Sequence, residues 1–480
     1  MHSILLIFLV AKLFPSYESA LPAKRSAARQ NAGPRSAERS LAERSPATPP
    51  NFIILLVDDQ RWDALSYDKT TYFATPEMAK LATRGTYFPD AFVTLSICSP
   101  SRAAILSGQY GSRNGVMNMQ SRLRDEESSL GNILKKNGYA TAVFGKWHLP
   151  NKPHDLGFDY SFIFKGITAY WDVDFLENEK KISTQGFVDD QTIDRTIYYL
   201  EKRDEKPLFL FVNTFAPHMD ENYDWPIKAA ERSHFNQQAA PLPVDWNTDF
   251  AGKPNYLATS RPHQRALEYG YDQPDSIRSH VYRYAAANYA MDQAVGRLAK
   301  YLTDNELLDN TYLLVLGDNG WFMAEHSLTS KVLAYEESMR IPFFVLGPKV
   351  LARKSEELVL NIDLYPTILD LANIQPTASS RAISLRNALF TKGKPTRKQV
   401  FYEAPLPVHG TYPHYAIRTK RWKYIVTYDL EQTDKLYFEE LYDLRSDPNE
   451  LKNLISNKGM AKALARLRKT AQQEIENSNL

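Results

Sequence analysis

Apolar runs without internal polar positions recur along the first two thirds of the chain. The longest are NFIILLV (51–57), ATAVFG (140–145), PLFLFVN (207–213), TYLLVLGDNG (311–320) and IPFFVLGP (341–348). Strands that are buried on both faces have this pattern, because helices cover both sides of a parallel sheet. The runs therefore predict an α/β domain built on a mostly parallel central sheet.

Segments with helical periodicity lie between these runs. Residues 75–85 predict a helix with Thr75 as N-cap, Pro76 in its first turn and Gly85 as its stop. Two further segments place apolar residues on one helical face; they are Ile193, Ile197 and Leu200 in 189–202, and Met291, Val295, Leu298 and Leu302 in 281–303. The alternation of strand and helix predicts helices on both faces of the sheet.

After about residue 385 the pattern changes. Residues 399–404, 414–428 and 435–444 read as antiparallel strands, and 459–478 as a closing helix. We therefore expect a main domain over residues 51–385 and a smaller C-terminal subdomain over 386–480. Residues 214–280, rich in Pro, Asn, Gln and aromatic side chains, are expected to be a long loop region.

The N-terminus differs from the rest of the chain. Residues 1–20 form an apolar run too short to span a bilayer, which is typical of a secretory signal peptide and predicts a secreted or periplasmic protein. Residues 21–50 hold six Lys and Arg against two Glu and predict a disordered basic linker. The net charge of the whole chain is only +2, which indicates no strong attraction to nucleic acid or to a membrane surface. Neither a nucleic-acid partner nor a stable membrane span is expected.

Polar side chains follow three of the apolar runs. Asp58 and Asp59 follow the first run, His218 follows the third, and Asp318 and Asn319 end the fourth. The carboxyl ends of parallel strands share one edge of a sheet, so these residues are expected to form one site. Three carboxylates and an amide favour Ca²⁺, and less strongly Mg²⁺, over Zn²⁺. The alternative is that these acids merely cap helices or loops.

The chain contains a single cysteine, Cys98, and therefore no internal disulfide. An isolated cysteine is most often a small buried apolar residue. Here, however, Cys98 begins the string CSPSRAAILSGQY, with Pro100 two positions and Arg102 four positions further on.

This string resembles the signature of the type I sulfatases, in which C-x-P-x-R directs oxidation of the cysteine to formylglycine. Six further blocks follow the order of that family: NFIILLVDDQRWDAL, GYATAVFGKWHL, FAPH, DNGWFMAEHSLTSK, YEESMRIPFFVLGP and ELYDLRSDPNELKNL. The resemblance covers most of residues 51–455. It implies the alkaline-phosphatase-like α/β sandwich with a small C-terminal antiparallel sheet, in agreement with the strand pattern.

The resemblance also implies roles for individual residues. Asp58, Asp59, Asp318 and Asn319 would hold Ca²⁺, with the modified Cys98 completing the ligand shell. Arg102 and Lys146 would brace the formylglycine, and the sulfate would be surrounded by Lys146, His148, His218 and Lys331. His326 lies in the block AEHS, where it either binds substrate or shapes the loop. Pro150, Ala324 and Ser327 stand where the family usually has glycine, which leaves the proposed ligands intact but alters the rim of the pocket.

The implied reaction is hydrolysis of a sulfate monoester, most plausibly on a sulfated carbohydrate. Of the two hydroxyls of hydrated formylglycine, one would attack sulfur and the other would expel sulfate. Asp318 is a candidate base for the attack, His148 for the elimination, and His218 or Lys331 a candidate donor to the leaving group. Maturation would require a formylglycine-generating enzyme. Two alternatives stay open: a phosphonate or phosphodiester hydrolase that uses the same nucleophile, and a non-catalytic sulfatase-like binding protein.

Overall fold

The computed structural model describes residues 48–67, 72–375, 381–432 and 434–478. The predicted signal peptide (1–20) and residues 21–47 of the predicted linker lie outside these residues. Within the part of the chain that is described, no helix is both long and apolar enough to cross a bilayer.

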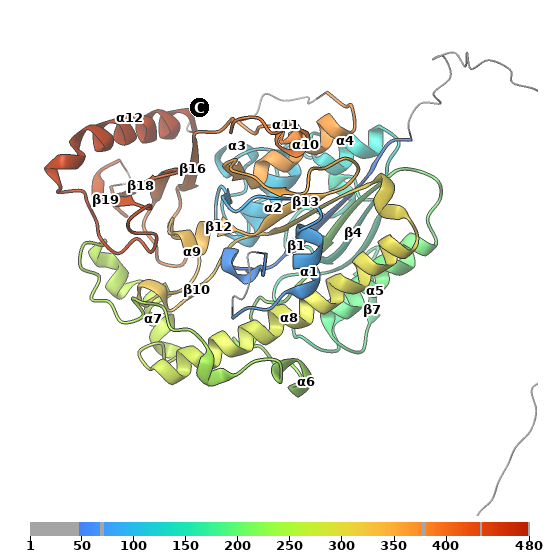
Figure 1. The fold of residues 1–480 in the computed structure, drawn as a ribbon, viewed down its shortest axis with the longest axis horizontal. Helices are drawn as coiled ribbons and strands as arrows, with labels where there is room; N and C mark the ends of the chain where they lie inside the picture. Colours follow the sequence, from blue (N-terminus) through green and yellow to red (C-terminus); the bar gives the residue numbers. More distant parts are fainter. Residues whose placement is uncertain (1–47, 68–71, 376–380, 433, 479–480) are drawn as a thin grey trace, which may run out of the picture. The chain divides into compact units, whose positions relative to one another are not determined.

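A ten-stranded sheet runs through the main domain (Figure 1). In order across the sheet its strands are β14 (Arg353–Lys354), β2 (Thr86–Tyr87), β13 (Phe343–Leu346), β9 (Thr311–Gly317), β1 (Asn51–Val57), β8 (Leu208–Asn213), β4 (Ala140–Lys146), β5 (Tyr160–Phe164), β6 (Asp174–Glu177) and β7 (Lys180–Ser183). The five strands from β9 to β5 are parallel. Antiparallel pairs β13–β9, β5–β6 and β6–β7 flank them. The predicted mostly parallel sheet is confirmed.

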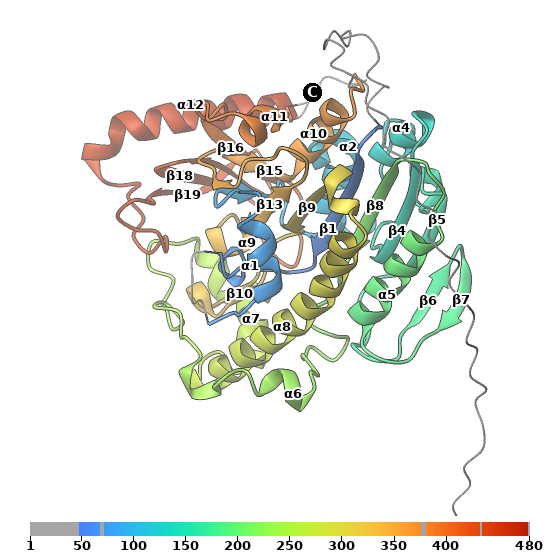
Figure 2. The same ribbon diagram turned by 45° about the vertical axis from the view of Figure 1, so that its right-hand side comes forward.

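Both faces of the sheet are apolar and covered by helices. Along β1, Phe52, Ile54 and Leu56 join one hydrophobic core, whereas Ile53, Leu55 and Val57 join another. The first core includes residues of α2 (Cys98–Ser107), α4 (Leu130–Lys136) and α10 (Leu364–Leu371). The second includes residues of α1 (Pro76–Ala82), α5 (Val188–Glu201) and α8 (Pro274–Asp304), and Figure 2 shows α5 and α8 on this face. The unbroken apolar pattern of β1 thus reflects burial on two sides.

Two predictions about helices need correction. Thr75 stands at the N-cap position of α1, but its side chain makes no cap hydrogen bond and instead bonds Ala64 O at 3.3 Å. Residues 214–280 are not one long loop, because they contain α6 (Ala229–Arg232), α7 (Arg261–Glu268) and the first turns of α8. Pro262 near the start of α7 and Pro274 at the start of α8 are the N-terminal signals that the sequence analysis passed over.

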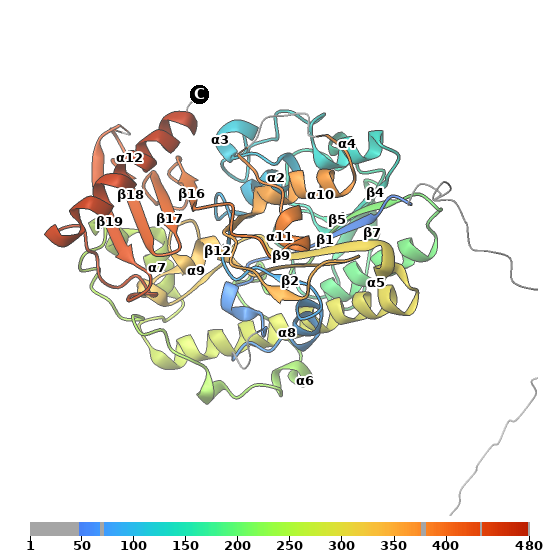
Figure 3. The same ribbon diagram turned by 45° about the horizontal axis from the view of Figure 1, so that its top comes forward.

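The C-terminal region forms a separate four-stranded antiparallel sheet. Its strands pair in chain order, and α12 (Ala461–Ser478) lies beside them (Figure 3). The strands are β16 (Gln399–Ala404), β17 (His414–Thr419), β18 (Trp422–Tyr428) and β19 (Leu436–Asp443). The predicted antiparallel sheet is confirmed, while the division at residues 385/386 stays a prediction.

Shorter elements connect the two sheets. The strands are β3 (Ala91–Phe92), β10 (Phe322–Met323), β11 (Thr329–Ser330), β12 (Arg340–Ile341) and β15 (Val359–Leu360); the helices are α3 (Gly111–Asn114), α9 (Glu336–Met339) and α11 (Arg386–Phe390). Glu403 of β16 donates its backbone N–H to Thr94 O at 3.0 Å, just after β3. The small sheet is therefore hydrogen-bonded to the segment that leads into α2.

Candidate active site

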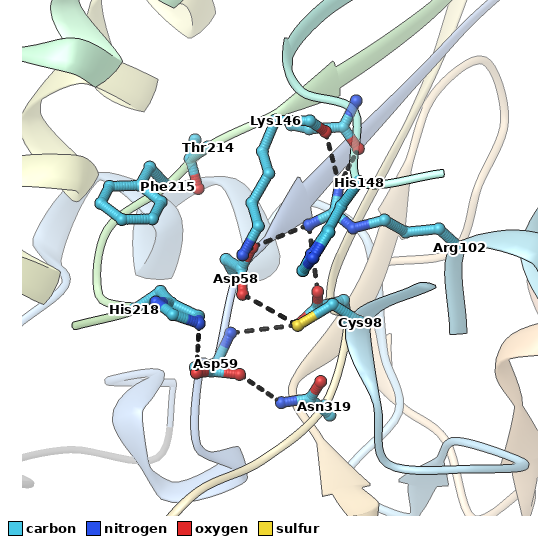
Figure 4. Close-up of polar contacts among 12 residues, drawn as sticks. Asp58, Asp59, Cys98, Arg102, Lys146, His148, Thr214, Phe215, His218 and Asn319 are labelled. Atoms are coloured by element: carbon cyan, nitrogen blue, oxygen red, sulfur yellow. Dashed lines mark hydrogen bonds and ion pairs between the residues drawn. The ribbon is translucent and has the colours of Figure 1, made fainter. Parts of the chain in front are cut away.

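Two pairs of polar residues meet where β1 and β9 end. Val57 is in register with Gly317, so Asp58 and Asp59 emerge beside Asp318 and Asn319. The backbone N–H of Asp59 donates to Asp318 Oδ1 at 3.0 Å. All four side chains are buried, and Figure 4 shows Asp58, Asp59 and Asn319 around one space. The prediction that these strand ends share a location is confirmed by the register of the parallel strands.

Cys98 reaches the same place from the first residue of α2. Lys331 Nζ lies 2.9 Å from Cys98 Sγ, and Asp58 Oδ1 lies 3.6 Å from it. Burial raises the pKa of the thiol, and the charge of Asp58 raises it further. A thiol held in its protonated form is a poor nucleophile. The surroundings of Cys98 therefore do not activate the unmodified thiol as a nucleophile.

Arg102 follows Cys98 by one helical turn and joins the carboxylates to a neighbouring strand. Its Nη2 bridges Asp58 Oδ2 at 2.9 Å and Asp318 Oδ2 at 3.0 Å. Its Nη1 donates to Lys146 O at 2.8 Å and to Asn213 Oδ1 at 2.9 Å. Residues i and i+4 of a helix share a face, which explains why cysteine and arginine stand four positions apart. The sequence analysis missed Asn213, whose only signal is its place at the end of β8.

Two lysines complete what we call the Cys98 cluster: Asp58, Asp59, Cys98, Arg102, Lys146, Asp318, Asn319 and Lys331. Lys146 Nζ lies 2.5 Å from Asp58 Oδ2, and Lys331 Nζ forms an ion pair with Asp59 Oδ1. Burial alone would raise the pKa of Asp58, but the nearby cations, Lys146 foremost, hold it well below its usual range. With all groups ionised, three carboxylates balance three basic side chains.

The cluster contains buried oxygens without hydrogen-bond donors. Asp59 Oδ2 and Asn319 Oδ1 have no hydrogen-bond partner among the described residues, although Asn319 Nδ2 donates to Asp59 Oδ1 at 2.5 Å. Buried polar atoms of this kind normally have a partner. Asp58, Asp59, Cys98 and His218 also present ligand atoms within 4.8 Å of one another. The carboxylate oxygens of this group, together with those of Asp318 and the amide oxygen of Asn319, are ligands of the type that a hard divalent cation prefers, whereas the thiol and the imidazole are softer ligands.

Two histidines face the cluster from the ends of β4 and β8. Nδ1 of His218 lies 2.5 Å from Met219 O, so this nitrogen carries the proton, and Nε2 lies 3.5 Å from Asp59 Oδ2. The backbone oxygen of His148 accepts from Ser99 Oγ at 2.5 Å, next to Cys98. Burial, together with the charge of Lys146, lowers the pKa of His218 to about 3 and that of His148 to about 2.

Two positioning residues were not found from the sequence. Asp189, in the first turn of α5, accepts the backbone N–H groups of Phe215 at 2.7 Å and Ala216 at 3.0 Å, and so holds the turn that carries His218. Tyr284 Oη, from α8, donates to Asp59 O at 2.9 Å and accepts from Arg61 N at 2.9 Å. An acid early in a helix and a tyrosine within one carry no sequence signal that distinguishes them from surface or core residues.

His326 belongs to a different group of side chains. Its Nδ1 lies 2.6 Å from Asp245 Oδ2, its Nε2 lies 3.6 Å from Glu337 Oε2, and its ring is buried. Within the described residues it forms no hydrogen bond or ion pair with the Cys98 cluster. A role of His326 in substrate binding stays a prediction. In the structure, its ring lies between Asp245 and Glu337 and links these two residues.

Comparison with known proteins agrees with the resemblance noted in the sequence. Residues 50–374 match the Sulfatase family, and residues 324–477 match the family described as N-sulphoglucosamine sulphohydrolase, C-terminal. An N-acetylglucosamine-6-O-sulfatase of Bacteroides thetaiotaomicron is 29% identical, with 86% of this chain and 84% of the relative aligned. A Delta 4,5-hexuronate-2-O-sulfatase of the same organism is 27% identical, with 87% and 86% aligned.

A solved structure extends this likeness to three dimensions. It is that of a protein in complex with its substrate D-glucosamine-2-N,6-O-disulfate. This chain matches it with a TM-score of 0.81 and 27% sequence identity, over 90% of this chain and 98% of the other.

Proposed function

Because the chain belongs to the sulfatase family, we propose that it hydrolyses sulfate monoesters on sugars derived from glycosaminoglycans, with 6-O-sulfated glucosamine as the first substrate to test. The family match and the full-length alignments support the reaction class. The sugar is suggested by the two relatives and the substrate complex, whose names specify sulfated amino sugars or uronates.

The proposal assigns a Ca²⁺ site to Asp58, Asp59, Asp318 and Asn319, with the oxygen of a modified Cys98 as a further ligand. The buried oxygens of Asp59 and Asn319 that lack donors support it. Bound Ca²⁺ would neutralise sulfate oxygens, and formylglycine would supply the attacking hydroxyl. Arg102 holds Asp58 and Asp318 in place through the bridge formed by its Nη2.

The remaining residues would bind sulfate and move protons. Lys146 and Lys331 are buried lysines. In a site that excludes water, their positive charges would stabilise the negative charge on the reacting sulfate more strongly than they would in water. His148 and Asp318 are the candidate bases. Lys331 Nζ and His218 Nε2 both face Asp59 and are the two candidate donors to the leaving oxygen, although His218 would first have to take up a proton at Nε2. His326, which pairs with Asp245 and Glu337, would contact only a part of the substrate that extends away from the Cys98 cluster.

The observation that carries the proposal is the position of Cys98, between Lys331 and Asp58 and beside buried oxygens without donors. The test has two parts. The mass of the peptide containing Cys98, from protein made in its own host, should show the aldehyde or its hydrate. The same protein should release sulfate from glucosamine 6-O-sulfate when Ca²⁺ is present.

Paired substrates separate the alternatives. Faster turnover of a phosphonate or phosphodiester than of the matched sulfate ester would identify a hydrolase of those esters. An unmodified thiol together with tight binding of the sulfated sugar and no turnover would identify a binding protein. The proposal further includes export to a secreted or periplasmic location and maturation by a formylglycine-generating enzyme. Detection of the protein outside the cytoplasm with residues 1–20 removed would test export.

A further inference from the structure

Three segments are linked, directly or through one another, to the backbone around Lys331. They are residues 220–224 after His218, helix α7, and residues 405–413 between β16 and β17. Figures 1 and 3 show α7 on the same side of the molecule as the C-terminal sheet. These segments come from distant parts of the sequence, and the first two lie within residues 214–280, the predicted long loop region.

Hydrogen bonds hold two of these segments to the strand and turn that present Lys331. His414 Nε2 lies 3.2 Å from Val332 O, and the Tyr402 hydroxyl donates to the same oxygen, so both ends of the 405–413 connection are fixed next to Lys331. His263 Nδ1 of α7 lies 2.8 Å from Ser327 O, just before β11. We call the three segments, residues 220–224, helix α7 and residues 405–413, the rim. Two of them are therefore anchored to the backbone that places Lys331 against Cys98.

Helix α7 and the 405–413 connection also approach each other closely. A Cβ atom placed on Gly410 would lie 3.5 Å from the backbone nitrogen of Arg261, and Gly410 adopts φ +72°. His409 precedes this glycine. Burial lowers the pKa of His409, and the charges of Lys331, Arg265 and Arg261 lower it further.

The rim is basic and carries an aromatic face. The Arg265 guanidinium carbon lies 5.1 Å from the centre of the Tyr223 ring, and Tyr223 is 51% exposed. Arg261 is paired with Glu268 at 2.5 Å. Within the described residues, Arg265 forms no ion pair with a carboxylate. It is thus a guanidinium on the rim whose charge is not already neutralised by a partner.

We propose that Arg265 and His409 form a specificity subsite for a second anionic group on the sulfated sugar, either another sulfate or a carboxylate, with Tyr223 packing against the sugar. The inference rests on the proposed function and names the substrate class of that site. A guanidinium binds both kinds of anion through paired N–H donors, and the flat ring suits the apolar face of a sugar. Substrates with one charged group would not use the subsite.

The experiment compares three substrates that share a 6-O-sulfate. These are glucosamine 6-O-sulfate, glucosamine 2-N,6-O-disulfate, and a disaccharide in which an unsaturated uronate precedes 6-O-sulfated glucosamine. In Arg265→Gln, the ratio of kcat/KM for a doubly anionic substrate to that for the monosulfate should fall about tenfold, mainly through KM. The doubly anionic substrate that shows this fall identifies the second group as sulfate or carboxylate. His409→Gln should lower the same ratio by about threefold, as expected for a neutral donor.

Arg84→Gln is the matched control. Arg84 is an exposed arginine just after α1, near the other end of the sheet, and its replacement should leave every ratio unchanged. If Arg265→Gln lowers all three kcat/KM values equally, or none of them, the subsite is refuted.

A binding measurement separates failure of the subsite from failure of the proposed function. Calorimetry on Cys98→Ala, with and without Arg265→Gln, measures affinity for the disulfate without turnover. If the wild-type protein releases no sulfate, the proposed function fails, but a tenfold weaker binding in the double variant still supports the subsite. Equal binding by both proteins refutes it even where the wild type is active.

Discussion

Among the described residues, two clusters of buried charge can be compared, and only one of the two resembles an active site. The Cys98 cluster stands at the ends of β1 and β9. The second, the Glu336 cluster, consists of Glu336, Arg418, Lys423 and Glu450, between α9 and the C-terminal sheet. All of these side chains are nearly inaccessible to solvent. Burial of charge therefore does not by itself distinguish them.

The two clusters differ in how closely their buried oxygens are paired with basic side chains and N–H groups. In the Glu336 cluster, Lys423 Nζ lies 2.9 Å from Glu336 Oε1 and 2.8 Å from Glu450 Oε1. Arg418 lies 3.2 Å from Glu336 Oε2, and Glu450 Oε2 accepts the Glu336 N–H at 2.7 Å. Counting ion pairs, each carboxylate oxygen there lies within 3.2 Å of a basic nitrogen or a backbone N–H. In the Cys98 cluster, Asp59 Oδ2 has only His218 Nε2, at 3.5 Å, and Asn319 Oδ1 has no hydrogen-bond partner among the described residues. A cluster whose oxygens are all paired internally stabilises the fold, whereas a cluster with poorly paired buried acceptors can bind a ligand.

The largest expected effect is that of Cys98→Ala. Loss of the nucleophile should reduce sulfate release at least about 10⁴-fold, because no other group in the cluster can replace it. The side chain is small and makes no strong hydrogen bond, so the melting temperature should change little. Sulfate release by ion chromatography and thermal unfolding measure the two effects. Turnover close to that of the wild type would show that Cys98 is not the nucleophile.

Next in size is Asp59→Asn, which removes one carboxylate from the proposed calcium site. We expect kcat/KM to fall by about 100-fold and the Ca²⁺ concentration for half-maximal activity to rise, since the substitution removes charge from the ligand set. EGTA should abolish wild-type activity. Asp63→Asn is the control, because Asp63 pairs with Arg61 near the cluster. An Asp59→Asn protein with wild-type calcium dependence would remove Asp59 from the metal site.

Glu336→Gln tests whether the Glu336 cluster stabilises the fold without taking part in catalysis. Removing one partner of a buried ion pair leaves charge uncompensated, so the free energy of unfolding in urea should fall by about 3 kcal/mol. Activity per folded molecule should stay within about threefold of wild type, as expected for a site that takes no ligand. A loss of activity as large as that of Asp59→Asn, at unchanged stability, would assign the Glu336 cluster to catalysis.

The last expected effect, a loss of stability at alkaline pH, concerns His326, which has a ring nitrogen within 4.8 Å of carboxylate oxygens of Glu337 and Glu450 at the border of the Glu336 cluster. Burial would lower its pKa, but hydrogen bonds to Asp245 and Glu337 raise it from 6.5 to about 9. The protonated form is thus favoured in the folded protein. Its contribution is fully present below pH 6.5 and is lost as the pH rises through 9, by about 3 kcal/mol in total. Urea unfolding should show this decline in the wild type and a flatter profile in His326→Asn. Identical profiles would show that His326 does not act through this pairing.

The sequence predicted much of the fold because its signals are local. The apolar run of β1 and the periodicity of α8 depend only on neighbours along the chain, and both elements formed where expected, although α8 begins seven residues earlier, at Pro274. The C-terminal strands were predicted for the same reason. Helix α7 was missed because it is short and amphipathic inside a segment rich in loop-forming residues.

From the sequence alone, the residues expected to meet at one site could be identified: the acids at the ends of β1 and β9, the single cysteine and the arginine one helical turn after it. Tertiary structure decided what these residues do to one another. Only the register of β1 with β9 places Asp58 beside Asp318, and only the packing of α2 brings Arg102 between them. Asn213, Asp189 and the rim around Arg265 depend on contacts between residues far apart in sequence. Such contacts are fixed by burial and geometry, which no local pattern of residues records.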